Sequence, residues 1–154
     1  MILEFELRVG SAADDATCGL VRSAASKASV VYARLEKAQS FLADDGPQEL
    51  ENMNRFVACR DDKVVGFIDY NAADGYVKML FVEPALQGQG LATELLRLAA
   101  QGAKVPLHLR TQAVNDGALA FYLGQGFQII DGEVENNWHG DSVVWITLSR
   151  RPGE

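Results

Sequence analysis

The feature that most restricts the fold of this chain is a buried strand that leads through a glycine-rich turn into a helix. Leu80, Phe81 and Val82 end the strand before Pro84, and a helix is expected over residues 88–100, which begin with Gly-Gln-Gly. The first turn of a helix has unpaired N–H groups and a partial positive charge, and both attract phosphate. Glycine lets the backbone approach an anion without a Cβ in the way. The stretch therefore predicts an anion cradle built from main chain.

The rest of the apolar pattern predicts an α/β fold, a mixed sheet with helices on both faces, as a single domain over residues 1–154. The nearly continuous apolar strands in the middle of the chain indicate burial on both faces of the sheet. Strands are expected over 2–9, 56–59, 64–68, 76–82, 107–111, 127–130 and 143–148, helices over 12–26, 32–43, 88–100 and 116–125, and one more helical turn within 47–53.

Composition and charge exclude several classes of function. The net charge is -7 and no basic stripe is present, which argues against general nucleic-acid binding, whereas an amine-bearing small molecule is compatible with it. The two cysteines and two histidines have no metal-ligand spacing, so we expect no metal. The N-terminus lacks the basic start and apolar run of a signal peptide, and no stretch approaches the length of a membrane span. We expect a soluble, cytoplasmic protein that does not bind membranes.

Two motifs resemble the signatures of the GNAT superfamily of acyl-CoA N-acyltransferases. A P-loop or a dinucleotide-binding motif does not fit the glycine-rich stretch, since GxxxxGK and the third glycine are both missing. Residues 87–92, Gln-Gly-Gln-Gly-Leu-Ala, match the superfamily's pyrophosphate motif Gln/Arg-x-x-Gly-x-Gly/Ala. Residues 115–127 match a second signature, in which an Asn precedes a helix that ends near a Phe-Tyr pair and is followed by Gly-Phe. The resemblance is clear over about residues 54–130 and implies a mostly antiparallel sheet flanked by helices.

The resemblance also implies a role for individual residues in binding acetyl-CoA. Main-chain groups of the strand before the motif would pair with the pantetheine arm, main-chain amides of the motif would hold the pyrophosphate, and the Asn115 side chain would reach the cofactor arm. Tyr122 would lie near the thioester sulfur as general acid. The cofactor-binding residues implied are Leu80, Phe81, Val82, Gln87, Gly88, Gln89, Gly90, Leu91, Ala92, Thr93, Asn115 and Tyr122.

The resemblance fails where superfamily members carry a catalytic base. Some members have a glutamate near the start of the fourth strand, where this chain has Tyr76, and others have one on the fifth strand, where it has Arg110. The remaining candidates for a base are Asp69, Asp74, Glu83 and His108. Some members need no base, because an amine near its pKa supplies its own neutral fraction.

Structural roles compete with several of these assignments. Gly88 and Gly90 can be turn glycines, Asn115 a helix N-cap, and Tyr122 a core aromatic residue. His108 on a short strand is more often structural than catalytic. Cys18 and Cys59 lack a neighbour that would activate a thiol, so a nucleophilic cysteine is not expected.

The function expected is transfer of an acetyl group from acetyl-CoA to a primary amine by direct attack. The acceptor, a small molecule or a peptide, is not identified by the sequence. Two alternatives stay open: a non-catalytic acyl-CoA-binding module, and a transferase that uses a longer acyl chain or makes an ester. A homodimer formed through an exposed strand near the C-terminus is also compatible with the pattern.

Overall fold

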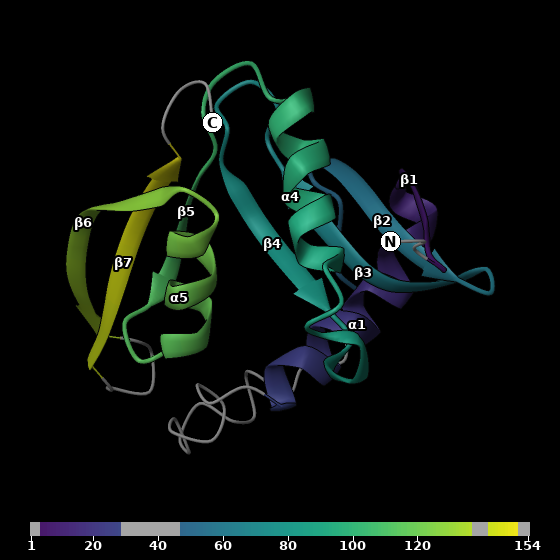
Figure 1. Cartoon of the computed structure of the whole chain (residues 1–154), viewed down its shortest axis with the longest axis horizontal. Helices are drawn as coiled ribbons and strands as arrows, with labels where there is room; N and C mark the ends of the chain where they lie inside the picture. Colours follow the sequence, from purple (N-terminus) through teal and green to yellow (C-terminus); the bar gives the residue numbers. More distant parts are fainter. Residues whose placement is uncertain (1–3, 29–46, 137–141, 151–154) are drawn as a thin grey trace.

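The computed structural model describes residues 4–28, 47–136 and 142–150 (Figure 1). Seven strands and three α-helices are assigned in these residues, together with two short 3-10 helices, η1 and η3. In chain order they are β1 (Glu6–Val9), η1 (Ala12–Asp14), α1 (Asp15–Ala28), β2 (Asn54–Arg60), β3 (Lys63–Tyr70), β4 (Val77–Val82), η3 (Pro84–Leu86), α4 (Leu91–Gly102), β5 (His108–Gln112), α5 (Asp116–Gly124), β6 (Phe127–Asn136) and β7 (Ser142–Arg150).

The strands form two sheets that meet at one point. Strands β1 to β4 pair antiparallel in chain order, and β5, β7 and β6 pair antiparallel in that order. A single parallel bridge, between Tyr76 and His108, joins β4 to β5 at the start of both strands. Beyond the bridge the two strands diverge, and a gap opens between the sheets (Figure 1).

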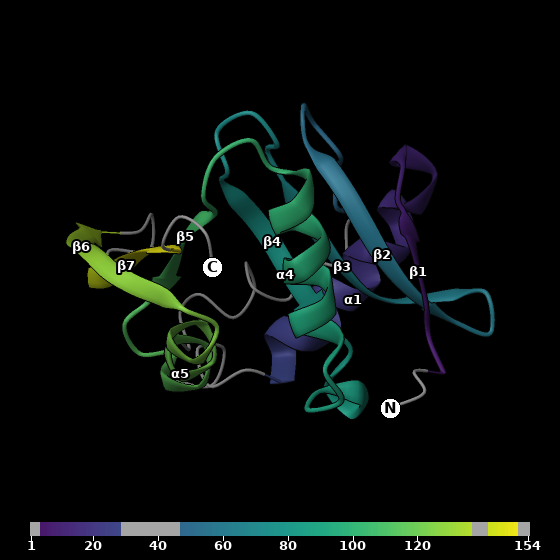
Figure 2. The ribbon, with the colours of Figure 1, turned by 45° about the horizontal axis from the view of Figure 1, so that its top comes forward.

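Helices cover both faces of the four-stranded sheet. Helix α1 lies on one face and α4 on the other, while α5 packs on the three-stranded sheet from the same side as α4 (Figures 1 and 2). Strand β3 is buried on both of its faces, since its residues from Val64 to Tyr70 are all buried, and each face needs a helix to cover it. Ile68 packs in the core under α4, and Phe67 packs in the smaller core under α1. The expected α/β fold with helices on both faces is confirmed.

Local sequence explains most of the element boundaries. The β2–β3 hairpin turns at Asp61 and Asp62, whose φ angles of 52° and 64° lie in the left-handed region that aspartate tolerates better than most residues. Nearer the N-terminus, α1 is preceded by η1, where Ser11 and Asp14 form a capping box.

Three expectations about helices need correction or lie outside the described residues. The helix expected over 88–100 begins at Leu91, because Gly88 and Gly90 have φ angles of 83° and 87° that a right-handed helix excludes. Residues 47–53 form no helical turn. The helix expected over 32–43 lies outside the described residues.

The other boundaries shift by a few residues. Strands β6 and β7 are longer than expected because they form one long hairpin. Of the strand expected over 2–9, the described residues 4 and 5 are not in a strand, and β1 begins at Glu6. No helix in the described ranges is long and apolar enough to cross a membrane.

Candidate active site

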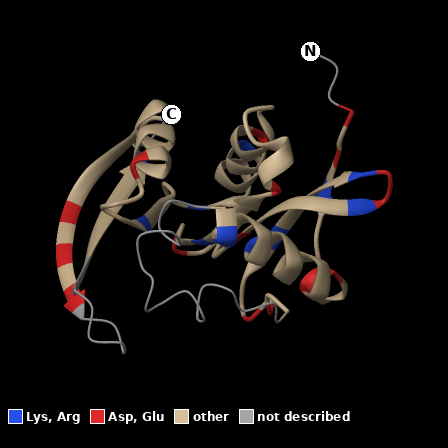
Figure 3. Cartoon of the chain, turned by 90° about the horizontal axis from the view of Figure 1, so that it is seen from below, with Lys and Arg blue, Asp and Glu red and all other residues tan. Residues whose placement is uncertain are grey.

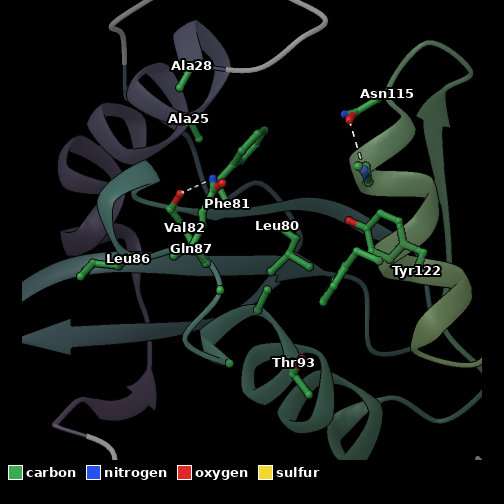
Figure 4. Close-up of a pocket in the computed structure, with 16 residues that line it drawn as sticks. Ala25, Ala28, Leu80, Phe81, Val82, Leu86, Gln87, Thr93, Asn115 and Tyr122 are labelled. Carbon is green, nitrogen blue, oxygen red and sulfur yellow. Dashed lines mark hydrogen bonds between the residues drawn. The ribbon is translucent and has the colours of Figure 1, made fainter.

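A pocket of about 520 Å³ lies at the open end of the gap between β4 and β5 (Figure 4). The end of β4, the turn after it and the start of α4 form one wall, α5 forms the opposite wall, and the last turns of α1 contribute two alanines. Its lining residues are Ala25, Ala28, Leu80, Phe81, Val82, Leu86, Gln87, Gly88, Gly90, Ala92, Thr93, Asn115, Gly117, Ala118, Phe121 and Tyr122.

The start of α4 presents unpaired main-chain N–H groups at this pocket. The first hydrogen bond of the helix runs from the Glu94 N–H to the Gly90 C=O, so the amides of Leu91, Ala92 and Thr93 lie before the helical ladder begins. Gly90 is the N-cap and has no side chain that could satisfy them. The helix end therefore offers donors and the positive end of a dipole to an anion.

Gly88 and Gly90 keep the space above these amides open. Both residues line the pocket in the left-handed conformation, and a Cβ added at either would meet no atom within 4 Å. Glycine is therefore favoured at these two positions by the left-handed backbone conformation, and not because a side chain would clash with neighbouring atoms of the protein. A diphosphate fits this cradle, because the donors are present and nothing in the described residues fills the space above the glycines.

Strand β4 has one unpaired edge beside the pocket. It pairs with β3 along the other edge, with Phe81 opposite Phe67 and Leu80 opposite Ile68. Towards β5 the described residues make only the bridge at Tyr76. Apart from the Val82 C=O, which accepts from the Gln87 side chain, the main-chain groups of Leu80 to Val82 on that edge are therefore available to an extended ligand with amide groups, which is the chemistry of a pantetheine arm.

Asn115 acts as the N-cap of α5. Its Oδ1 accepts a hydrogen bond of 3.2 Å from the Ala118 N–H. The residue also lines the pocket, and its amide group is directed towards the cavity (Figure 4). Asn115 therefore caps the helix through its side-chain oxygen, and its side-chain nitrogen remains available to donate to a ligand.

Tyr122 lies on the wall opposite the cradle with its hydroxyl directed into the cavity (Figure 4). Its ring makes edge-to-face contacts with Phe121 and Phe127, at centroid distances of 5.3 and 5.5 Å. Burial among these rings raises the pKa of Tyr122 to about 12. The phenol is therefore protonated at neutral pH and can donate a proton or a hydrogen bond.

All the predicted binding residues except Gln89 and Leu91 line the pocket. Gln89 is exposed outside it, and the Leu91 side chain is buried in the core, which leaves Leu91 only its main-chain amide for a ligand. The Gln87 side chain donates from Nε2 to the Val82 C=O at 3.3 Å, so it connects the turn to the end of β4.

The four candidate bases do not line the pocket. Asp69 is buried and bonded to Arg55 at 2.7 Å, and Asp74 accepts the Tyr76 N–H at 2.8 Å within a turn. Glu83 lies 3.7 Å from the Lys63 ammonium, and the His108 ring packs against Tyr76 at the bridge. Tyr122 is the one titratable side chain among the described residues that line the pocket.

Sequence reasoning missed several lining residues. Phe121 belongs to the Phe-Tyr pair of the second motif, so that pair was a usable signal. Ala25 and Ala28 could not be found in this way, because small residues on a helix carry no local sign of what they face. Leu86, Gly117 and Ala118 were also missed.

No group of three or more metal-ligating side chains occurs within the described residues. Cys18 and Cys59 are both free and buried. Burial raises the pKa of the Cys18 thiol to about 12, so this thiol is not a nucleophile at neutral pH.

This chain is similar in sequence to known acetyltransferases. Residues 23–127 match the model of the acetyltransferase (GNAT) family. Acetyltransferase Atu2258 of Agrobacterium fabrum is 31% identical over 109 residues, which cover 68% of this chain and 79% of that protein.

Two solved structures share the fold. The GCN5-related N-acetyltransferase structure from Rhodopseudomonas palustris has a TM-score of 0.73 at 20% identity and covers 94% of both chains. The PaiA N-acetyltransferase of Thermoplasma acidophilum, solved in complex with coenzyme A, has a TM-score of 0.67 at 18% identity, covering 92% of this chain and 97% of that one.

Proposed function

Since this chain belongs to the GNAT family of acetyltransferases, we propose that it transfers an acetyl group from acetyl-CoA to a primary amine by direct attack. The observation that carries the proposal is the cradle: two left-handed glycines and the free amides of Leu91 to Thr93 face one pocket with Tyr122 on its other wall. Acetyl-CoA supplies the activated acyl group, and the chain supplies the groups that bind it and complete the transfer.

The donor would be held mainly by main chain. The amides at the start of α4 would bind the pyrophosphate, and the open edge of β4 would pair with the amides of the pantetheine arm. The Asn115 amide nitrogen would donate to the same arm. Coenzyme A bound to the PaiA relative is consistent with such a site, and the residues of this chain have the chemistry that the donor requires.

In the reaction, the neutral amine nitrogen forms a bond to the thioester carbonyl carbon, and the carbon–sulfur bond breaks. A main-chain N–H near the end of β4 would steady the oxygen as it becomes negative. The Tyr122 hydroxyl would give its proton to the leaving sulfur, the proton lost from the amine would pass to solvent, and Tyr122 would take back a proton from solvent before the next turnover. No covalent bond to the protein is needed.

A thiol-release assay tests the proposal. The purified chain would be mixed with acetyl-CoA and separately with spermidine, lysine, tryptamine and a peptide that begins with alanine, and free thiol and the mass of the product would be followed. We expect thiol release that depends on one of these amines, with an acetylated amine as product.

Two controls separate the alternatives. Octanoyl-CoA in place of acetyl-CoA would show whether a longer chain is preferred, in which case the acetyl assignment is wrong. Calorimetry with CoA would detect a binding module, since binding without turnover on any amine favours that alternative, and no binding at all contradicts the cradle itself.

A further inference from the structure

The pocket crosses the free edge of β4 and reaches both faces of the four-stranded sheet. Leu80 and Val82 pack with the core under α4, whereas Phe81 packs with the core under α1, as the alternation of side chains along a strand requires. All three residues line the pocket, and so do Ala25 and Ala28 of α1. The cavity therefore has one part on the α4 side, which includes the cradle, and a second part on the α1 side (Figure 4).

The part on the α1 side, here named the α1 chamber, is lined by Ala25, Ala28 and Phe81. The two alanines are three positions apart, so they lie on one face of the helix. The Phe81 ring is half-buried and lies 6.0 Å from the Phe67 ring, measured between centroids, which holds it in place and leaves part of it open to the chamber. The described wall thus consists of two methyl groups and an aromatic ring.

The groups that would bind the donor lie away from the α1 chamber. The pyrophosphate would bind at the start of α4, and Asn115 and Tyr122 come from α5, which lies on the same side of the sheets as α4 (Figure 2). The thioester would lie at the edge of β4 with Tyr122 at its sulfur. Its open side then faces the α1 chamber, so an amine that attacks the carbonyl carbon approaches from there, and the rest of the amine occupies the chamber.

The charges of the molecule do not favour a second cation in this chamber. None of the described residues that line the pocket is charged. A row of exposed acidic residues, Asp131, Glu133 and Glu135, runs along β6 (Figure 3). Strand β7 separates β6 from β5, so this row lies at the outer edge of its sheet, outside the pocket lining. A second ammonium group would lose water in the chamber without a counter-charge from the described lining, whereas an apolar group gains by burial there.

We infer, resting on the proposed function, that the acceptor is a primary amine with an apolar chain or ring, which binds in the α1 chamber. The amine nitrogen points to the thioester, and the apolar group packs against Phe81 in the space that the small side chains of Ala25 and Ala28 leave. The bonds that form and break are those of the transfer described above. Tryptamine in the panel belongs to this class, whereas spermidine and lysine carry further charged groups.

Pentylamine and cadaverine provide the first test, because they have the same carbon chain and differ by a second ammonium group. We expect kcat/KM of the wild-type chain to be about tenfold or more higher for pentylamine, since its far end is uncharged. Along the series from ethylamine to pentylamine, kcat/KM should rise by about fourfold for each methylene group that becomes buried. Thiol release and the mass of the product measure each rate.

Ala28→Leu should fill part of the chamber from an exposed position on α1, and leucine is a good helix former. We expect kcat/KM to fall by about tenfold or more for pentylamine and by less for ethylamine, with an unchanged Kd for CoA and an unchanged melting temperature. Ala24→Leu is the matched control, since Ala24 is an exposed alanine of the same helix outside the pocket lining. This control should behave as wild type.

Ala28→Glu tests the role of charge by placing a carboxylate at the chamber. The ratio of kcat/KM for cadaverine to that for pentylamine should rise by about tenfold, because the second ammonium group now has a counter-charge. Ala24→Glu adds the same charge outside the pocket lining and should leave this ratio as in wild type. If Ala28→Leu melts below wild type, the ratio measured in Ala28→Glu decides.

Three results would overturn the inference and leave the proposed function intact. The first is a wild-type chain that acetylates cadaverine as well as pentylamine or better, and the second is an Ala28→Leu variant that behaves like Ala24→Leu with every amine. The third is a loss of turnover with octanoyl-CoA in Ala28→Leu at an unchanged preference among amines, which would place the acyl chain in the chamber. If the wild-type chain binds CoA but acetylates no amine, the proposed function fails first, and the acceptor class fails with it.

Discussion

Arg55 and Asp69 form a two-pronged ion pair inside the four-stranded sheet. Nε lies 2.7 Å from Oδ1 and the second guanidinium nitrogen 2.9 Å from Oδ2, with side chains 0% and 1% exposed. The remaining donors reach Asp15 at 2.7 Å and the carbonyls of Ser11 and Gln48 at 2.8 and 2.9 Å. Arg55 therefore fixes the start of α1 on the sheet, and the other end of this helix lines the pocket.

Asp69→Asn should lower the free energy of unfolding by about 3–5 kcal/mol, because it removes the fully buried counter-charge of Arg55 and leaves only that of Asp15, which is partly exposed. Urea unfolding at neutral pH measures this. Arg97→Ala is the control, since its pair with Glu94 is at the surface and is worth under about 1 kcal/mol. A similar decrease in the free energy of unfolding in both variants would show that the buried ion pair stabilises the fold no more than the surface pair does.

Gly90→Ala should weaken CoA binding by about tenfold or more, because a Cβ would project into the cradle and the φ angle of 87° disfavours alanine. Calorimetry with CoA measures the loss. Gly124→Ala is the matched control, since a Cβ there also meets no atom within 4 Å, yet the residue lies in α5 away from the pocket lining. If both variants bind CoA like wild type, the cradle does not hold the pyrophosphate.

Tyr122→Phe should lower kcat by roughly ten- to a thousand-fold, because the leaving sulfur loses its proton donor. The Kd for CoA should change little, since the ring and its contacts with Phe121 and Phe127 remain. Steady-state kinetics with the best amine and calorimetry with CoA measure the two quantities. An unchanged kcat would show that Tyr122 lines the pocket but does not donate the proton to the leaving sulfur.

The pH dependence of the wild-type rate gives a second view of Tyr122. With a pKa raised to about 12, the phenol stays protonated across the usable range. The rate should therefore rise with pH as the amine loses its proton, with no fall below about pH 11 that comes from this tyrosine. A fall near pH 8 that disappears in Tyr122→Phe would contradict the raised pKa.

The sequence was most informative where the chemistry is local. Gly88 and Gly90 before a helical pattern predicted the cradle, and the apolar strands around Phe67 predicted a sheet covered on both faces. The helix start was placed too early for the same local reason, because periodicity continues into the turn and only backbone angles exclude it.

Long-range relations could not be predicted from the sequence. The pairing of Arg55 with Asp69 depends on the β2–β3 register, and the bridge at Tyr76 depends on how two sheets meet. The burial of the Gln112 side-chain oxygen, which has no hydrogen-bond partner, is a property of the packed structure, because a glutamine on a short strand looks like any surface glutamine in the sequence. Register and packing, which set these features, are decided by the whole fold.

Stability at alkaline pH should depend on Cys18, whose pKa burial raises from 9.0 to about 12. Between these values the unfolded thiol has lost its proton while the folded one keeps it, so the unfolded state binds fewer protons. The free energy of unfolding therefore falls as pH rises above 9, by up to about 1.4 kcal/mol per pH unit, and below that pH the group contributes nothing. Tyr122 adds a fall of the same sign above its ordinary value of 10.

Cys18→Ala should begin at lower stability, because a buried side chain has been shortened, but its free energy of unfolding should decline less steeply with pH. Urea unfolding at intervals from about pH 8 to pH 11 measures the slope, which is independent of the starting level. In Tyr122→Phe, the free energy of unfolding should decline less steeply with pH than in wild type only above about pH 10. Parallel curves for wild type and Cys18→Ala would show that the Cys18 thiol ionises at the same pH in the folded and unfolded chain.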